Sequence, residues 1–123
     1  MFKKRPSRLI ERSNVTGKLT IVPTPLGNLG DMTARALEAL EQVDVVCAED
    51  TRVTGKLLAH FGIEARLERC DENVIVSRTP ALVARMRKGE QIAFCSDAGM
   101  PGISDPGCVL VDAAREAGVL VDV

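Results

Sequence analysis

The stretch QIAFCSDAGMPGISDPGCVLVDAAREAGVLVDV, residues 91–123, decides the fold. Its two ends, QIAFC (91–95) and VLVDV (119–123), are short apolar runs, which predicts two buried strands. Residues 105–117 between them are predicted to form a helix, with Asp105 as N-cap and Pro106 at the first helical position. A strand, a helix and a second strand in this order are typical of neighbouring strands in a parallel sheet.

The same alternation runs through the rest of the chain from Leu19 onward. The predicted strands are 19–23, 43–48 and 66–69, and the predicted helices are 31–42, 51–61 and 80–88. Asp31 and Thr79 are the predicted N-caps of the first and third of these helices. We therefore predict an α/β fold, a five-stranded, mostly parallel sheet with helices on both faces. Residues 19–123 would be one domain of a larger protein, because the sequence stops on a predicted buried strand.

Composition narrows the class of protein. The chain has 123 residues, 46% of them hydrophobic and 27% charged, which is typical of a globular domain with one core. It has no apolar run of about 18 residues and no secretory signal, so we expect no membrane association. Its four cysteines form no CxxC pair and its single histidine is His60, which argues against a metal site and for a reducing cytoplasmic location.

Charge is distributed unevenly along the chain. Residues 1–18 carry six basic residues and one acidic residue, whereas the remaining 105 carry ten basic and sixteen acidic residues. We predict a basic N-terminal arm that includes Lys3, Lys4 and Arg5. Such an arm either binds phosphates or is a solvated, flexible tail.

Three predicted loops carry the candidate chemistry, because open α/β sheets bind ligands outside the carboxyl ends of their strands. The loops are PTPLGNLGD (23–31), AEDTRVTGK (48–56) and SDAGMPGISDPG (96–107). The first is neither the GxGxxG fingerprint of dinucleotide-binding folds nor a P-loop. No GxSxG elbow surrounds Ser96 or Ser104, which argues against a hydrolase.

Some residues in these loops have a predicted structural role, and others are better candidates for ligand binding. In the second loop, Asp50 or Thr51 could cap the following helix, and Thr51 is the preferred cap. Otherwise Asp50 or Arg52 would contact a ligand or a polar interface. The third loop is longer than a typical strand-to-helix connection, and its glycines allow close backbone approach to a ligand. Capping explains Asp105, but no structural role explains Asp97.

The motifs TPLGNLGDMTARALEAL (24–40), AEDTRVTGKLLAHFGI (48–63) and SDAGMPGISDPG (96–107) occur in the order found in the tetrapyrrole methylases. The chain thus resembles this family of S-adenosylmethionine-dependent methyltransferases, and most of all its branch that acts on small-subunit ribosomal RNA. The resemblance implies a donor site between two α/β domains, of which this chain holds the first. The residues that it assigns to S-adenosyl-L-methionine are Pro25, Gly27, Ser96, Asp97, Ala98, Gly99, Ile103 and Ser104.

The resemblance further implies 2′-O-methylation of a cytidine ribose in the 16S rRNA of the 30S subunit, by a homodimeric protein without a metal. Asp105 is a candidate to accept the ribose hydroxyl proton. Asp50, Arg52 and Asn73 are candidates to contact RNA, although Met100 and residues 70–74 depart from the family pattern.

Two alternatives remain, a tetrapyrrole (corrin or porphyrin) C-methyltransferase and a non-catalytic domain that dimerises or binds a nucleotide. The family continues past the fifth strand with a Pro-Gly-Pro-Ser segment and a second domain. We therefore expect residues 1–123 alone to bind the donor poorly and to be inactive.

Overall fold

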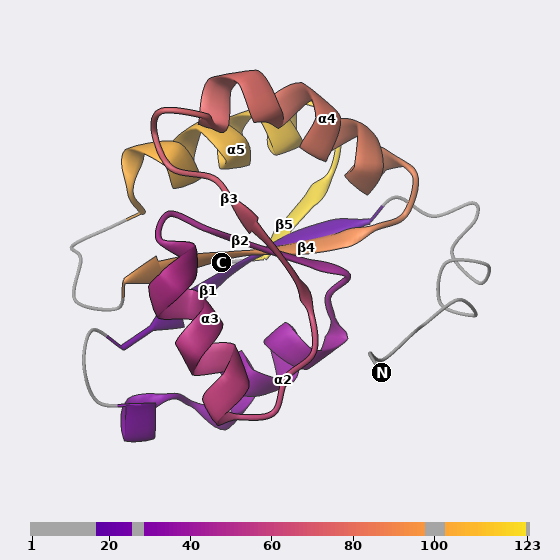
Figure 1. Ribbon diagram of the computed structural model, residues 1–123. Helices are drawn as coiled ribbons and strands as arrows, with labels where there is room; N and C mark the ends of the chain where they lie inside the picture. The colour runs from indigo at the N-terminus through magenta and orange to yellow at the C-terminus, as the bar shows by residue number, and fades with distance from the viewer. Residues whose placement is uncertain (1–16, 26–28, 98–102, 123) are drawn as a thin grey trace.

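The computed structural model describes residues 17–25, 29–97 and 103–122, which form one α/β layer structure (Figure 1). Its five strands pair in the order β3-β2-β4-β1-β5, and all pairings are parallel. The elements are β1 (Lys18–Thr24), the 3-10 helix η1 (Leu29–Asp31), α2 (Ala34–Gln42), β2 (Val45–Ala48), α3 (Thr51–His60), β3 (Arg66–Arg69), α4 (Ile75–Arg87), β4 (Gln91–Asp97), α5 (Asp105–Glu116) and β5 (Leu120–Asp122). The predicted fold class is confirmed.

The two faces of the sheet have separate apolar clusters, because successive strand side chains point to opposite faces. Ile21 and Phe94 pack with residues of α4 and α5 in one cluster. Val22 and Val46 pack with residues of α2 and α3 in the other. Figure 1 shows α4 and α5 above the sheet and α2 and α3 below it.

The connections change face in the middle of the sheet. The chain passes from β1 to β2 through α2 and from β2 to β3 through α3, both on one face. It returns through α4 to β4, which lies between β2 and β1, and α5 then leads to β5 on the other face. The neighbours β1 and β4 are therefore followed by segments that turn to opposite faces. A switch point of this kind marks the ligand site of open α/β sheets.

Helix α2 begins three residues later than predicted. Asp31, the predicted N-cap, belongs to η1, and Thr33 caps α2 by accepting the Ala36 N–H at 3.0 Å. Leu29 and Met32 pack against the apolar cluster under α2, and the Met32 N–H donates to the Leu29 carbonyl at 3.2 Å. Because η1 occupies residues 29–31, the helix starts after it, and Thr33 is the next residue with a side chain suited to cap it.

Helix α4 begins at Ile75, five residues before the predicted start at Pro80. Proline within a helix lacks one hydrogen-bond donor and disfavours the preceding turn. Here, however, Ile75, Thr79, Leu82 and Met86 form a continuous buried stripe at helical spacing. Burial of Ile75 outweighs the cost of the proline, and Thr79 Oγ1 donates to the Ile75 carbonyl at 2.7 Å.

The amino end of the described chain is held closely. The Gly17 N–H donates to the Met86 carbonyl at 2.6 Å, and a Cβ at Gly17 would lie 1.8 Å from the Glu90 carbonyl oxygen. Gly17 and Lys18, which the sequence assigned to the basic arm, therefore belong to the fold. Lys3, Lys4 and Arg5 lie outside the described residues.

Candidate functional site at the carboxyl ends of β1 and β4

The carboxyl ends of β1 and β4 are joined residue by residue. In their parallel register Pro23 lies opposite Ser96 and Thr24 lies opposite Asp97. Thr24 Oγ1 donates a buried hydrogen bond to the Ser96 carbonyl at 3.3 Å. Since both side chains are only 8% exposed, this bond fixes the point at which the two loops separate.

Five of the predicted donor-site residues fall within the described chain, and all five lie at this switch point. Pro25 is half-buried and follows β1 directly, Ser96 is buried near the end of β4, and Asp97 is the last residue of β4. Ile103 and Ser104 immediately precede α5. The other three, Gly27, Ala98 and Gly99, lie outside the described residues.

Ser104 is the N-cap of α5, in place of the predicted Asp105. Its backbone is extended, and its carbonyl accepts the Cys108 N–H at 2.9 Å. Its hydroxyl makes no capping bond and is buried without a hydrogen-bond partner among the described residues. A buried hydroxyl without a partner costs free energy, which a bound polar ligand would recover.

Ile103 can pack close to α5 because residue 107 is a glycine. A Cβ at Gly107 would lie 2.4 Å from Ile103 Cγ2 and 3.2 Å from Phe94 Cε1. Gly107, in the first turn of α5, therefore lets Ile103 approach the helix over the fully buried Phe94 ring. Sequence reasoning did not select Gly107, and its only signal was a glycine two residues after Asp105, the predicted cap.

Asp105 is the first residue of α5, and its side chain is exposed. It was predicted as the N-cap, which the structure contradicts, since Ser104 has the extended backbone of the cap. The exposed carboxylate lies two residues after Ile103, on the side of the switch point from which α5 starts.

At the end of β2, Asp50 is the N-cap of α3, and the prediction that Thr51 caps this helix is wrong. The Asp50 carboxylate accepts the Arg52 backbone N–H at 3.0 Å and the Arg52 Nε–H at 3.4 Å. The hydrogen bonds from Arg52 hold the pKa of Asp50 below its ordinary value. Of the two residues that the sequence offered as the cap, Asp50 and not the preferred Thr51 has this role.

At the end of β3, Asp71 organises the chain in a similar way. Its carboxylate accepts the Arg69 Nε–H at 2.6 Å and the Asn73 N–H at 3.0 Å. The hydrogen bond from Arg69 is the main cause that lowers the pKa of Asp71. Asn73 is exposed, and β2 and β4 lie between its strand and β1. Sequence reasoning missed Arg69, because arginine in a short edge strand has no distinguishing pattern.

The comparison with known proteins identifies this arrangement. The sequence profile of the tetrapyrrole (corrin/porphyrin) methylases matches residues 18–123. The chain belongs to the tetrapyrrole methylase family. The resemblance of the three loop motifs is thereby confirmed.

Individual relatives narrow the comparison within the tetrapyrrole methylases. The chain is 53% identical over 108 residues to ribosomal RNA small subunit methyltransferase I of Escherichia coli O157:H7, covering 88% of this chain and 38% of that protein. It is 52% identical over 105 residues to the protein of the same name from a Synechocystis species, covering 85% and 38%. The chain thus spans less than two fifths of the length of these curated relatives.

Solved tetrapyrrole methylase structures have the same fold. Uroporphyrin-III-C-methyltransferase from Thermus thermophilus superposes with a TM-score of 0.67 at 26% identity, over 86% of this chain and 46% of that one. A cobalt precorrin-4 methyltransferase superposes with a TM-score of 0.69 at 22% identity, over 98% and 46%.

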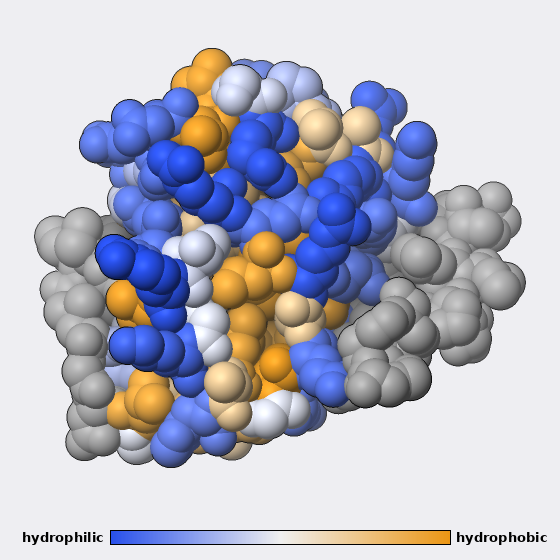
Figure 2. Space-filling view, in the orientation of Figure 1, coloured by the Kyte–Doolittle hydropathy of each residue, from blue (hydrophilic) through white to orange (hydrophobic). Residues whose placement is uncertain are grey.

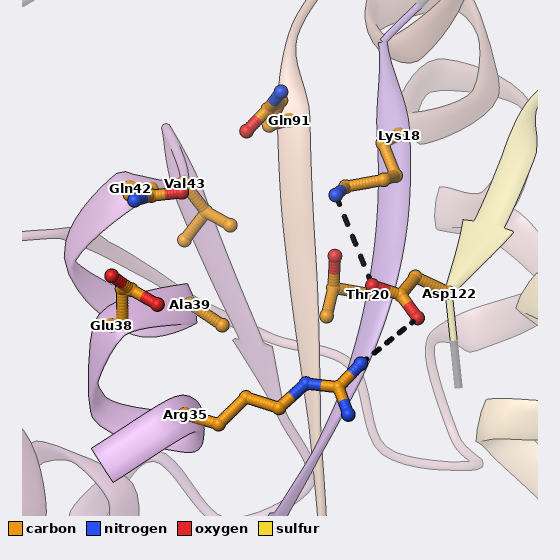
Figure 3. Close-up of a pocket in the computed structure, with 9 residues that line it drawn as sticks. All are labelled: Lys18, Thr20, Arg35, Glu38, Ala39, Gln42, Val43, Gln91 and Asp122. Carbon is orange, nitrogen blue, oxygen red and sulfur yellow. Dashed lines mark ion pairs between the residues drawn. The ribbon is translucent and has the colours of Figure 1, made fainter.

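A separate hollow of this tetrapyrrole methylase domain lies away from the switch point (Figure 3). It is about 160 Å³ in volume, and Lys18 and Arg35 both approach Asp122 there, at 3.9 and 3.8 Å. Lys18 and Gln91, which also line it, are the first residues of β1 and β4, so it lies toward the amino ends of these strands. Ligand pockets are usually at least about 300 Å³, and no predicted site residue lines this hollow.

The described ranges were also searched for membrane and metal features. None of their helices has the length and apolar character needed to cross a bilayer. They hold no group of three or more His, Cys, Asp or Glu side chains arranged for a metal ion. Cys47, Cys70 and Cys95 are buried free thiols, and burial raises the pKa of Cys95 to about 12.

Proposed function

We propose that the full-length protein transfers a methyl group from S-adenosyl-L-methionine to the 2′-hydroxyl of a cytidine ribose in small-subunit rRNA. In this proposal the present chain supplies one half of the donor site. The observation that carries it is the switch point between β1 and β4, which the Thr24–Ser96 bond fixes and which α5 follows with a buried Ser104 hydroxyl that has no partner among the described residues.

The choice of RNA over a tetrapyrrole rests on similarity. The relatives that are about half identical over most of this chain are named for small-subunit rRNA. The solved uroporphyrin-III enzyme has the same fold at only 26% identity. A corrin or porphyrin C-methyltransferase is therefore the second candidate, and a non-catalytic dimerising domain is the third.

The donor would lie against the ends of β1 and β4. Pro25 and the Ser96–Asp97 backbone would line it from the two strands, together with Gly27, Ala98 and Gly99. Ile103 would offer an apolar surface, and the Ser104 hydroxyl would hydrogen-bond to a polar group of the ligand. The residues fit such a ligand because Ser104 Oγ is buried and lacks a partner among the described residues, and because Gly107 keeps Ile103 in place.

When bound, S-adenosyl-L-methionine supplies a methyl carbon activated by its sulfonium. The residues of this chain would then act mainly by alignment, because holding donor and acceptor in line makes the displacement effectively unimolecular. The buried bond between Thr24 and Ser96 keeps the two loops at a fixed separation. A ribose hydroxyl is a weak nucleophile, and the exposed Asp105 carboxylate is our candidate to accept its proton.

The acceptor would approach from the ends of β2 and β3, where Asp50, Arg52 and Asn73 lie. The basic residues Lys3, Lys4 and Arg5 would add contacts to phosphates of the 30S subunit. We further propose a cytoplasmic homodimer, and we expect residues 1–123 alone to bind the donor weakly and to transfer no methyl group.

The test uses the full-length protein, 30S subunits that lack the modification, and isotopically labelled donor. We expect label in one cytidine of the small-subunit rRNA, and the adjacent phosphodiester should resist alkaline hydrolysis, since a 2′-O-methyl group blocks that cleavage. Label on a base, or transfer to a uroporphyrinogen-type acceptor instead of RNA, would overturn the proposal. Asp97→Asn should weaken donor binding measured by calorimetry, and unchanged affinity would remove Asp97 from the donor site.

A further inference from the structure

Two exposed arginines at neighbouring strand ends, Arg52 and Arg69, each donate a hydrogen bond to an aspartate two residues away. Arg52 follows β2 and donates from Nε to Asp50 Oδ1 at 3.4 Å. Arg69 ends β3 and donates from Nε to Asp71 Oδ2 at 2.6 Å. The arginine side chains are 88% and 56% exposed. These bonds engage the Nε edge of each guanidinium, so the edge formed by its two terminal nitrogens is left for a second ligand.

The carboxylates are themselves fixed by the backbone. Asp50 accepts the Arg52 N–H as the cap of α3, and Asp71 accepts the Asn73 N–H, each at 3.0 Å. The backbone therefore orients each carboxylate, and the carboxylate orients its arginine. A side chain held in this way loses little conformational freedom when it binds a ligand.

The packing of α3 on β3 places the two arginines on the same face of the sheet, toward the same edge. A Cβ at Gly55 would contact Leu67 Cδ2 at 3.5 Å, so Gly55 faces β3 at Leu67. Arg52 precedes Gly55 by three residues on the same face of the helix, and Arg69 follows Leu67 by two on the same face of the strand. Both steps lead toward the carboxyl edge of the sheet. Figure 2 shows strongly hydrophilic residues gathered where α3 begins and β3 ends.

This edge continues the line of the candidate donor site. In the order β3-β2-β4-β1, β3 lies two strand spacings, or about 10 Å, from β4. A polymer whose ribose reaches the β1–β4 switch point would extend past the ends of β2 and β3. Guanidinium forks match the paired oxygens of a phosphodiester.

Resting on the proposed function, we propose that Arg52 and Arg69 form a phosphate clamp that holds the RNA backbone beside the acceptor ribose. The clamp would select RNA as the methyl acceptor, because it binds a phosphodiester chain. It would not contact the methyl donor. Each arginine would contribute both a local positive charge and an oriented fork to phosphate binding.

The test measures binding of small-subunit rRNA by the full-length protein as a function of salt. Arg52→Gln and Arg69→Gln should each weaken RNA binding by about tenfold. Each should also lower the slope of log affinity against log salt by about 0.7 to 0.9. Donor affinity, measured by calorimetry, should not change. Arg87→Gln, an exposed arginine in the last turn of α4 on the other face, is the matched control and should change neither quantity.

A further variant separates charge from geometry. Arg69→Lys keeps the charge but loses the fork, so it should retain the salt slope and still lose affinity. It also tests the clamp if Arg69→Gln does not fold, as judged by thermal melting. An unchanged slope in the double Gln variant would overturn the clamp, as would an effect on a carboxylated tetrapyrrole without an effect on RNA. Failure of the wild-type protein to methylate rRNA would instead overturn the proposed function.

Discussion

Thr24 and Ser96 are seventy-two residues apart in sequence, yet the Thr24 hydroxyl donates to the Ser96 carbonyl at 3.3 Å inside the sheet. The bond lies at the last paired residues of β1 and β4, where the chain turns to opposite faces. It thus joins the two strand ends from which the loops leave. The donor site that we propose depends on the separation of these two loops.

Replacing Thr24 by Val should loosen this coupling. The change keeps the shape of the side chain but removes the donor, and a lost buried hydrogen bond costs about 1 kcal/mol of unfolding free energy. We also expect weaker donor binding by the full-length protein. Denaturant titration and calorimetry measure the two effects.

Thr20→Val is the matched control, because Thr20 is on the same strand and face but opposite Ala93 and Asp122, away from the switch point. It should leave donor affinity unchanged. If both variants weaken donor binding equally, the effect comes from changes in β1 as a whole and not from loss of the Thr24–Ser96 bond.

The order of elements could be predicted from sequence because apolar runs and helical caps are local signals. The strand order could not, since the placement of β4 between β2 and β1 depends on pairing across the whole chain. Proline at position 80 was a misleading local signal, because burial of Ile75 extends α4 in front of it.

Capping residues show the same limit within the candidate site. Asp50 and Thr51, or Ser104 and Asp105, are adjacent polar residues that can each cap a helix. The path of the preceding strand or loop decides which of the two residues has the extended backbone of an N-cap. That path depends on tertiary contacts and cannot be read from the local sequence. The described flanks of the loop selected for its composition, 96–97 and 103–104, lie at the switch point. The importance of Gly107 and Arg69, in contrast, is evident only from their contacts.

Gly107→Ala should destabilise the protein, although alanine is usually the better helix residue. Its Cβ would overlap Ile103 Cγ2 and press on the Phe94 ring, and overpacking of this kind costs about 1 to 3 kcal/mol. Combining it with Ile103→Ala should recover part of the loss, as a double-mutant cycle would measure. Additive losses would contradict the contact.

Gly55→Ala in α3 should have the opposite effect on stability to Gly107→Ala. The new Cβ would meet Leu67 at 3.5 Å, an ordinary van der Waals distance. The substitution should therefore stabilise the protein by about 0.5 to 1 kcal/mol, since it removes a helix-interior glycine. Denaturation midpoints of the two glycine variants should move in opposite directions.

Ser104→Ala should separate stability from ligand binding. An N-cap serine normally contributes about 1 kcal/mol, but the Ser104 hydroxyl makes no capping bond and is buried without a partner among the described residues. We expect unfolding free energy to stay the same or rise, while donor binding by the full-length protein weakens by up to about tenfold. Thr33→Ala, which removes a cap bond of 3.0 Å, should lose about 1 kcal/mol and leave the donor unaffected.

Asp71 should make stability depend on pH in the acid range. Its pKa is lowered in the folded protein, chiefly by the hydrogen bond from Arg69, so the folded state favours the ionised carboxylate. This contribution is complete above the ordinary pKa of 3.8 and is lost as pH falls through the lower folded value. Asp71→Asn should therefore flatten the decline of unfolding free energy below about pH 4. Arg69→Gln should remove most of the same dependence, because it removes the main cause. A decline that is as steep in both variants as in the wild type would mean that other carboxylates produce it.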